Sequence, residues 1–508
     1  MALGIEEKLA RIAEGTPPRL LDLFSGCGGL TLGFVSAGCV SVGGVELDKD
    51  AARSYAANFH SDKEGCSRGL PEVLHALPRD ILKIKPRELL RDLERGSNVR
   101  GIDLLIGGPP CPAFTRVGRA KLREIAKHPE AFKHDPRATL YRQYLDYVKA
   151  LRPVALVMEN VPDILNWGGH NLGAEICEAL EQLDYECRYT LLNAAHYGVP
   201  QMRERFFLVA IHKDARREPG FPTPTHRVDF PPGYKGARNV ALKNVLKVDP
   251  WFQTPLVPPL NAPSAVTAGD ALSDLPPLTA HLTGDDRRGA RHLDGKVPYG
   301  ERAVSPYARF MRTWPGFQQD GYLRDHVTRC LTQRDYRLFE RMASGADYPR
   351  AHKLAVDLFN EELKRRQKRG ESFEEGSESY EKLRASYVPP YDPEKFPNKW
   401  RKMDKGEPAR TLMAHLGKDT YSHIHYDSAQ QRVISVREAA RLQSFPDGFR
   451  FSGTMNPAFR QIGNSVPPLL AWAIAYELLE RLGARVRHPV PDFSGPARFE
   501  DKQSVRVA

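Results

Sequence analysis

An alternation of short apolar runs with amphipathic stretches over residues 19–212 constrains the fold of this chain more than any other feature. The apolar runs, which have the length and residue content of buried strands, are RLLDLF (19–24), VSVGGVE (40–46), IDLLIG (102–107), VALVMEN (154–160), YECRYTLLNA (185–194) and RFFLVAIH (205–212). The stretches with helical spacing are LTLGFVSAG (30–38), LDKDAARSYAANF (47–59), ATLYRQYLDYVKALRP (138–153) and NLGAEICEALEQL (171–183). Strands that alternate with helices build a doubly wound, mostly parallel sheet, whose ligands bind at the carboxyl ends of the strands. The sequence therefore predicts an α/β fold.

The chain changes character after about residue 215. Residues 216–300 are rich in proline, glycine and arginine, and a charged helical stretch follows at 334–371. Because no strand–helix alternation survives there, we expect a second, different domain. An Asn-Ser-Pro turn within 461–482 opens a strongly apolar helix, and residues 484–508 have the charge and proline content of a loose tail.

Composition places the chain among soluble globular proteins, with 508 residues, 41% of them hydrophobic and 27% charged. No apolar run approaches the roughly 18 residues of a membrane span, and the N-terminal stretch lacks the apolar core of a secretory signal. The seven cysteines never form a CxxC pair, which favours a reducing compartment and argues against a disulfide framework or a zinc site. The net charge of +11 suits a polyanionic partner such as nucleic acid.

The segment DLFSGCGGL (22–30) has the pattern of a strand, a glycine-rich turn and the start of a helix. Glycines there let backbone N–H groups approach a ligand, and Glu46, at the end of the next strand, suits the two hydroxyls of a ribose. Thr31 breaks the dinucleotide-binding fingerprint at its third glycine position. These features indicate an adenosine-type cofactor, with Asp80 as a candidate acid for the adenine amino group; a plain tight turn is the alternative.

The segment GGPPCPAF (107–114) holds Cys111 between prolines, which fix φ and lack an N–H, so it belongs neither inside a helix nor in a central strand. By itself it is also compatible with a tight turn around a buried thiol. Two other segments sharpen the interpretation. Glu159 ends a buried strand, where desolvation raises the pKa of a carboxyl, and Arg203 and Arg205 alternate where the last strand begins. A cysteine, a protonatable acid and two cations at strand ends of one sheet indicate nucleophilic attack on a target that gains negative charge.

The motifs follow one another along the chain in the order DLFSGCGG, VELD, RDI, GGPPC, ENVP, QMRER, REAARLQSFPDGF and QIGNSVPP. With these motifs in this order, the chain resembles a DNA (cytosine-5) methyltransferase of the prokaryotic restriction–modification type. They cover residues 19–211 and 430–482. The resemblance implies the fold of class I S-adenosylmethionine-dependent methyltransferases with a smaller, mixed target-recognition domain. It implies a catalytic, cofactor-binding domain at 1–230, a target-recognition domain at 231–455, and a segment at 456–508 whose helix returns to the catalytic domain before the loose tail.

For the reaction, the resemblance implies that a methyl group passes from S-adenosyl-L-methionine to C5 of a cytosine flipped out of duplex DNA, leaving S-adenosyl-L-homocysteine. Cys111 would add to C6 of the base, Glu159 would hydrogen-bond N3 and the exocyclic amine, and Arg205 would hold O2. Arg203 would orient Glu159 or a phosphate. The cofactor contacts that the motifs imply are Phe24, Ser25, Gly26, Gly28, Gly29, Glu46, Asp80, Pro109, Asn464, Ser465 and Val466.

The stretch after Cys111 is basic, and its candidates for phosphate contacts are Arg116, Arg119, Lys121 and Arg123. A solvated basic loop is the alternative to a family-type loop that closes over the flipped base. Two departures from the family pattern, Pro112 in place of the usual Gln and Thr115 in place of Ser, concern loop contacts and leave the reaction intact. The REAARLQSFPDGF segment is expected to be structural and to organise the recognition domain.

Three other interpretations stay open. A tRNA cytosine-5 methyltransferase of the same fold carries a Cys-Phe-Thr segment that this chain lacks, and a catalytically inert DNA-binding homologue is expected to lack the nucleophile or the acid. Thr31 and the Pro-Cys loop disfavour a nicotinamide oxidoreductase.

We expect a monomeric, cytoplasmic enzyme that binds double-stranded DNA and needs neither metal nor membrane, and any cognate restriction endonuclease would be encoded separately. The recognised DNA word is not readable, because no code maps the variable region onto bases.

Overall fold

The computed structural model describes residues 4–61, 72–93, 101–110, 138–166, 170–231, 234–245, 249–283, 292–293, 295–300, 304–417 and 421–493. Within these ranges no helix is long and apolar enough to cross a membrane. The expected nucleophile and the four basic residues expected to contact phosphates lie outside them; these are Cys111, Arg116, Arg119, Lys121 and Arg123.

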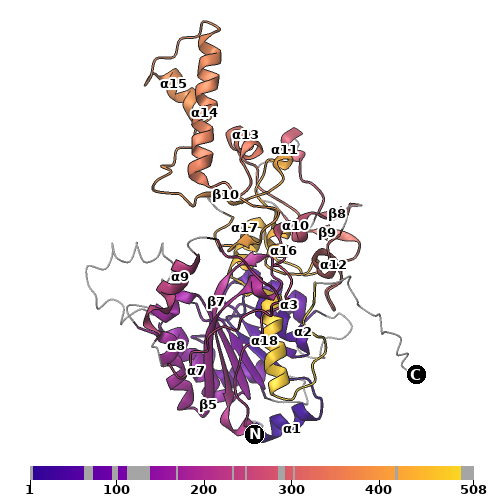
Figure 1. The fold of residues 1–508 in the computed structure, drawn as a ribbon. Helices are drawn as coiled ribbons and strands as arrows, with labels where there is room; N and C mark the ends of the chain where they lie inside the picture. The colour runs from indigo at the N-terminus through magenta and orange to yellow at the C-terminus, as the bar shows by residue number, and fades with distance from the viewer. Residues whose placement is uncertain are drawn as a thin grey trace.

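The centre of the molecule is a six-stranded sheet in the order β2-β1-β3-β4-β7-β5 (Figure 1). Its strands are β1 (Arg19–Leu23), β2 (Val40–Val45), β3 (Leu104–Gly107), β4 (Ala155–Asn160), β5 (Tyr185–Asn193) and β7 (Glu204–His212). β1 to β4 pair in parallel, whereas β7 runs antiparallel to both of its neighbours. The expected α/β fold with a mostly parallel sheet is confirmed. β7 reverses direction because a short turn (Ala194–Tyr197) and the strand β6 (Gln201–Met202), with no crossover helix, connect it to β5.

Each face of the sheet buries its own apolar core, because successive side chains of a strand point to opposite faces. The helices over one face are α2 (Gly29–Ala37), α3 (Lys49–Phe59) and α18 (Pro468–Arg481), and those over the other are α5 (Pro86–Leu93), α7 (Ala138–Leu151) and α8 (Leu172–Glu181). Leu20 and Leu104 belong to the first core, and the adjacent Leu21 and Leu105 belong to the second. The sheet edges that carry the loops are therefore held between two packed layers.

The helix α18 returns from the far end of the chain to pack along α2, as Figure 1 shows. The two helices approach closely at Gly33, where a Cβ would lie only 2.4 Å from the backbone nitrogen of Trp472. Only glycine fits such an approach. The preceding helix α17 (Met455–Asn464) ends at the Asn-Ser-Val-Pro-Pro segment, and a proline begins α18. The packing places this junction beside the first glycine-rich turn.

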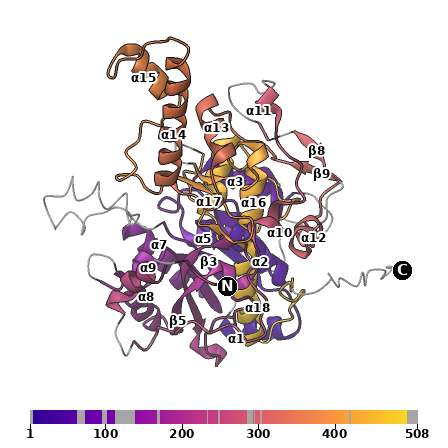
Figure 2. The ribbon, with the colours of Figure 1, turned by 45° about the horizontal axis from the view of Figure 1, so that its top comes forward.

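A second, irregular region lies above the sheet in Figure 1. Its helices are α10 (Ala268–Leu272), α11 (Ala280–Thr283), α12 (Pro306–Thr313), α13 (Gln333–Arg341), α14 (Tyr348–Gln367), α15 (Glu378–Ala385) and α16 (Val436–Leu442). Its short strands include β8 (Lys296–Pro298), β9 (Tyr322–Arg324), β10 (Trp400–Lys402), β11 (Ala409–Arg410) and β12 (Tyr421–Ile424). In both views α14 and α15 project away from the rest of the molecule (Figures 1 and 2). Further helices of the chain are α1 (Ile5–Ala13), α4 (Glu72–His75) and α9 (Tyr234–Ala241).

The charged stretch 334–371, expected to be helical throughout, is instead two helices, α13 and α14. Between them Gly345 adopts a φ of +68°, a left-handed conformation that interrupts a helix. The Asp347 side chain then accepts a hydrogen bond from the Arg350 N–H and caps the start of α14. The break lets α14 leave the body of the molecule at a new angle.

Candidate active site

The amino end of β7 meets the carboxyl end of β4 at one edge of the sheet. In this antiparallel pair Glu159 lies opposite Phe207, and Asn160 lies opposite Phe206. Arg205 precedes both phenylalanines on β7, so it reaches the edge at which β4 ends. ENVP ends β4 and QMRER begins β7, and the two segments meet because these strands run in opposite directions.

Glu159 and Arg205 form an ion pair that is almost enclosed. Arg205 Nε lies 3.1 Å from Glu159 Oε1, and their side chains are 14% and 12% exposed. Burial raises the pKa of Glu159 above its ordinary 4.5, and the nearby arginines only partly oppose that rise. Burial likewise lowers the pKa of Arg205. The Glu159 carboxyl can therefore hold a proton at a higher pH than an exposed glutamate can.

The glycine–proline segment after β3 lies against this ion pair. A Cβ on Gly108 would come within 3.0 Å of Glu159 Oε2, so a larger residue there would press on the carboxylate. The Asn160 side chain donates to the Pro109 carbonyl at 2.9 Å and to the Tyr141 hydroxyl at 2.7 Å. The described range stops one residue before the expected nucleophile. These contacts hold the chain on its approach to that position.

Sequence reasoning missed Asn160. It is 3% exposed, and its Oδ1 also accepts a hydrogen bond from the Val161 N–H at 2.9 Å. A buried amide has several donors and acceptors that must find partners, and an asparagine at the end of a buried strand is a signal for such a role. The missing information was which loop would supply the partner.

The glycine-rich turn between β1 and α2 wraps around Glu46. Phe24, Gly26 and Gly28 have φ values of +60°, +54° and +98°, which place this turn in a left-handed backbone. The Glu46 carboxylate accepts a hydrogen bond from the Gly26 N–H at 2.8 Å. Ser25 Oγ is buried and has no hydrogen-bond partner in the described part of the chain. An oriented carboxylate beside an unpaired hydroxyl fits the polar groups of an adenosine-type ligand, so the residues present suit the expected cofactor.

Asp80 lies beside the same turn. The Arg79 N–H donates to the Glu46 carbonyl at 2.6 Å, which joins the Arg-Asp-Ile segment to the end of β2. The Asp80 carboxylate accepts from the Leu82 N–H at 3.1 Å and lies 3.6 Å from Lys83 Nζ. Its side chain is 28% exposed, so it remains accessible to a ligand at this edge.

The junction Asn464–Val466 packs onto the turn from the other side. A Cβ on Gly29 would lie 2.4 Å from the Val466 carbonyl oxygen, and Cys27 Sγ lies 3.2 Å from Ser465 Oγ. Asn464 is exposed next to them. The structure thus brings together the expected cofactor residues of the first turn, β2, the Arg-Asp-Ile segment and the last motif.

Arg203 has different contacts from those expected. Its side chain is 1% exposed, and it donates to the backbone carbonyls of Leu412 and Gly463, both at 2.9 Å. Burial also holds its pKa well below the ordinary value. We expected Arg203 to orient Glu159 or a phosphate; in this structure its two terminal nitrogens donate to backbone carbonyls from distant segments. Only the neighbouring Arg205 forms the ion pair.

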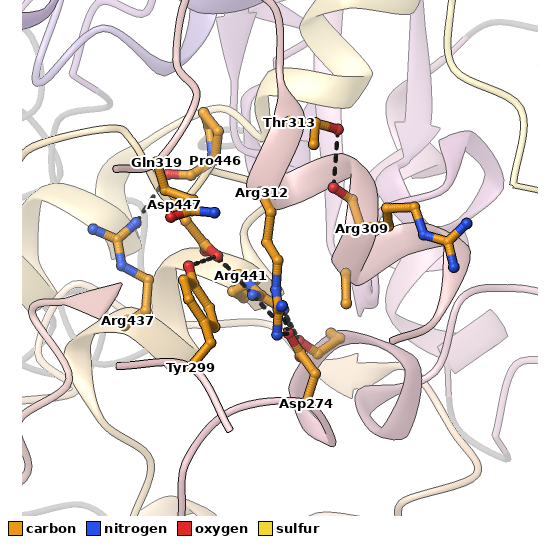
Figure 3. Close-up of polar contacts among 12 residues, drawn as sticks. Asp274, Tyr299, Arg309, Arg312, Thr313, Gln319, Arg437, Arg441, Pro446 and Asp447 are labelled. Carbon is orange, nitrogen blue, oxygen red and sulfur yellow. Dashed lines mark hydrogen bonds and ion pairs between the residues drawn. The ribbon is translucent and has the colours of Figure 1, made fainter. Parts of the chain in front are cut away.

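The REAARLQSFPDGF segment contains a fully enclosed ionic cluster, shown in Figure 3. Arg441 bonds Asp447 with two donors at 2.7 Å and reaches Asp274 at 2.8 Å, and all three side chains are 0% exposed. Arg312 adds a second arginine to Asp274, and the Tyr299 hydroxyl donates to Asp447. The cluster joins α10, α12 and α16, which is a structural arrangement.

The comparisons with known proteins identify the family of this chain. The C-5 cytosine-specific DNA methylase family matches residues 19–251 and 322–480. The chain is 38% identical over 461 residues to M.OihORF3336P of Oceanobacillus iheyensis, named as a candidate type II methyltransferase, with 90% of this chain and 94% of that protein covered. It is 31% identical over 477 residues to the type II methyltransferase M.AgeI of Thalassovita gelatinovora, with 90% and 98% covered.

Among solved structures, a candidate DNA modification methyltransferase encoded within an Escherichia coli prophage shares the fold. The TM-score is 0.57 at 21% sequence identity, and the likeness covers 92% of this chain and 99% of that one. The family match includes the glycine-rich turn, the Glu159–Arg205 pair and the α17–α18 junction. The chain therefore belongs to the C-5 cytosine-specific DNA methylase family and is a DNA (cytosine-5)-methyltransferase.

Proposed function

We propose that this chain transfers a methyl group from S-adenosylmethionine to C5 of a cytosine within a specific word of duplex DNA, with Cys111 as the nucleophile. The observation that carries the proposal is the Glu159–Arg205 ion pair, enclosed beside Gly108 at the sheet edge that also bears the Glu46 turn. A protonatable acid and a guanidinium side by side match the N3 and O2 edge of a cytosine.

The cofactor would lie against the glycine-rich turn. Ser25 Oγ and the backbone around Gly26 would contact its amino-acid part, Glu46 its ribose hydroxyls and Asp80 its adenine amino group. Asn464 and the rest of the α17–α18 junction would close the site from the other side. When bound, S-adenosylmethionine supplies an electrophilic methyl group.

The residues of this chain supply the remaining chemistry. The Cys111 thiolate forms a bond to C6 of the base, and the C5–C6 double-bond electrons make C5 nucleophilic. Glu159, holding a proton towards N3, and Arg205, donating to O2, stabilise the negative charge that the addition creates. After C5 has gained its methyl group, with S-adenosylhomocysteine as the other product, C5 loses its proton to solvent. The C–H electrons reform the C5–C6 double bond, and the Cys111–C6 bond breaks to return the thiolate.

The substrate base must leave the DNA stack to reach this site. A stacked cytosine presents neither face of its ring to a thiol, and the ion pair that would receive its edge is itself nearly buried. We therefore propose base flipping, with the second region at 231–455 reading the DNA word and the domain at 1–230 performing the reaction. The basic loop with Arg116, Arg119, Lys121 and Arg123 would contact phosphates around the displaced nucleotide.

Two relatives that match 90% of this chain are named as type II methyltransferases, one of them as a candidate. We propose on that basis that the chain marks host DNA as part of a restriction–modification system, with a cognate endonuclease on a separate polypeptide. Methylation-sensitive sequencing of a host that expresses the chain should reveal one methylated word, and no such word would contradict sequence-specific marking.

Covalent trapping tests the mechanism without knowledge of the word. A plasmid fragment amplified with 5-fluorocytosine in place of cytosine presents every possible site, and fluorine at C5 prevents the final elimination. With methyl donor present, we expect the wild-type chain to migrate as a DNA adduct in a denaturing gel and Cys111→Ala to form none. An absence of adduct for the wild-type chain, or an adduct with Cys111→Ala, would refute the proposal. Transfer of labelled methyl groups to tRNA but not to DNA would favour the tRNA alternative.

A further inference from the structure

The α17–α18 junction is held between the cofactor turn and the second region. Its residues Ser465 and Val466 contact the turn through Cys27 and Gly29. On the opposite side a Cβ on Gly463 would lie 2.6 Å from the backbone nitrogen of Ala414, so the two backbones touch. One short segment therefore contacts both the expected cofactor site and the chain that follows β11.

Arg203 ties these segments to the amino end of β7. It lies two residues before Arg205, and its two terminal nitrogens donate to the carbonyls of Leu412 and Gly463 at 2.9 Å each. The strand just before it, β6, pairs with β11, so that Met202 lies opposite Arg410. A buried guanidinium that bonds carbonyls from two segments fixes the spacing between them.

A pair of buried glutamines makes a parallel connection. Gln201 Oε1 accepts from the Leu412 N–H at 2.8 Å, and Gln201 Nε2 donates to Gln443 Oε1 at 2.5 Å. Gln443 Nε2 in turn donates to the Ser465 carbonyl at 2.5 Å. Both glutamine side chains are 0% exposed. We call Gln201, Arg203 and Gln443 the bridge cluster.

We propose that the bridge cluster couples the base site to the cofactor site, and that its three members are positioning residues that touch neither ligand. The inference rests on the proposed function, because it takes the Glu159–Arg205 pair as the base site and the α17–α18 junction as a wall of the cofactor site. A base that enters beside Arg205 and a cofactor that settles against Ser465 both act on backbone held by the same cluster. Densely packed polar contacts have few alternative arrangements, so a shift at one end changes the other.

The coupling has a measurable thermodynamic form. If DNA tightens the binding of S-adenosylhomocysteine by some factor, S-adenosylhomocysteine must tighten the binding of DNA by the same factor. Such factors typically lie between about 5 and 150, and we expect the wild-type chain to show one in this range.

The test compares two titrations of the full chain. The Kd of S-adenosylhomocysteine is measured by calorimetry without DNA and then with a saturating plasmid fragment that the wild-type enzyme methylates. Arg203→Met removes both carbonyl contacts and keeps a long side chain. We expect Arg203→Met to bring the ratio of the two Kd values, without and with DNA, to within about twofold of one. The Kd without DNA should change by less than about threefold, because the variant leaves the ligand contacts intact.

Arg437→Met is the matched control. Arg437 is also 0% exposed and donates to the carbonyls of Pro446 and Phe449 at 2.9 Å each, but it lies outside the bridge cluster. We expect it to lower the melting temperature and to keep the wild-type factor. A wild-type factor in Arg203→Met, or an equal loss of the factor in both variants, would overturn the proposal.

Gln443→Met keeps the proposal testable if Arg203→Met does not fold. It removes the contact to the Ser465 carbonyl and leaves Arg203 in place, so we expect the factor to fall part of the way towards one. An unchanged factor in a folded Gln443→Met would also overturn the proposal. A wild-type chain that binds no S-adenosylhomocysteine at all contradicts the proposed function, whereas one whose binding ignores DNA contradicts only the coupling.

Discussion

Two arginine–carboxylate clusters in this molecule use the same chemistry and differ in how completely their hydrogen bonds are satisfied. Arg441 bonds both oxygens of Asp447, both oxygens of Asp274 and the Ala271 carbonyl, in full enclosure. Arg205 has a single contact with Glu159 at 3.1 Å, and both side chains keep some exposure. The first cluster joins three helices of the second region, whereas the second retains bonding capacity for a ligand.

The pKa values of Asp447 and Glu159 shift in opposite directions, in line with this difference in hydrogen bonding. Burial acts to raise the pKa of Asp447, but Arg441, Arg437 and the Tyr299 hydrogen bond together outweigh burial and hold that pKa below the ordinary 3.8. At Glu159 burial prevails over Arg205, and the pKa lies above the ordinary 4.5. The number of charge-assisted hydrogen bonds therefore decides whether a buried carboxyl stays ionised or becomes able to hold a proton.

The largest effect should come from Glu159→Gln, which keeps the shape of the side chain and removes its titrating proton. We expect kcat to fall by about 10²- to 10⁴-fold, the usual contribution of a positioned acid, with little change in melting temperature. Transfer of labelled methyl groups to plasmid DNA measures the rate, and a thermal melt checks the fold. A variant that retains more than about a tenth of the wild-type kcat would remove Glu159 from the chemistry.

Arg441→Met, in contrast, is expected to lower the stability of the fold. Removal of the guanidinium leaves Asp447 buried without its bonded arginine and leaves Asp274 with Arg312 alone, which should cost about 3–5 kcal/mol of the free energy of unfolding. Denaturant titration measures this loss. The matched control is Arg365→Met, because Arg365 is 55% exposed in its ion pair with Glu362. Exposed pairs contribute less than about 1 kcal/mol, so an equal loss in the two variants would contradict the assigned role.

The two carboxyls should give pH dependences of opposite sign. The folded pKa of Asp447 lies below its unfolded value, so its stabilisation is complete above pH 3.8 and is lost as the pH falls through the folded pKa. The folded pKa of Glu159 lies above its unfolded value, so its contribution is complete below pH 4.5 and is lost as the pH rises through the folded pKa.

Each proton contributes a slope of up to about 1.4 kcal/mol per pH unit to the free energy of unfolding. Asp447→Asn should flatten the acid side of the stability curve, and Glu159→Gln should flatten the slope above pH 4.5. Denaturant unfolding at a series of pH values distinguishes the two. Identical curves of the free energy of unfolding against pH for the two variants would contradict the opposite pKa shifts of Asp447 and Glu159.

The smallest effect is expected from Asn160→Ala, which releases the Pro109 carbonyl beside the ion pair. Loss of one positioning hydrogen bond, worth about 1–3 kcal/mol when a buried group is left unpaired, should lower kcat by about tenfold. Asn171→Ala is the control, since Asn171 caps α8 away from the site. The control should lose about 1 kcal/mol of stability and no activity. A similar kcat in both variants would show that the Asn160 contact does not position the loop.

Several elements could be predicted closely from local sequence. The run 40–46 forms β2 at Val40–Val45, and the run 154–160 forms β4 at Ala155–Asn160. Apolar periodicity and glycine or proline boundaries are local properties, so these strands are readable residue by residue. The same holds for the glycine-rich turn and for Glu46, whose spacing from it is set by one helix and one strand.

Other features depend on contacts between distant segments. The direction of β7 follows from its short connection to β5, and the break between α13 and α14 follows from Gly345 and the Asp347 cap. Asn160 became recognisable only when the Pro109 carbonyl lay beside it. Local periodicity does not encode which loop supplies a hydrogen-bond partner.

By itself, the sequence determined the chemical groups of this protein: the cysteine between prolines, the acid at a strand end, the arginines of QMRER and the glycine-rich turn. The tertiary structure decided which arginine faces which partner. Arg205 pairs with Glu159, whereas Arg203, two residues away, bonds Leu412 and Gly463. The physical reason is that residue type and periodicity specify burial, while the partner of a buried charge is whichever group the packing of remote segments brings within hydrogen-bond distance.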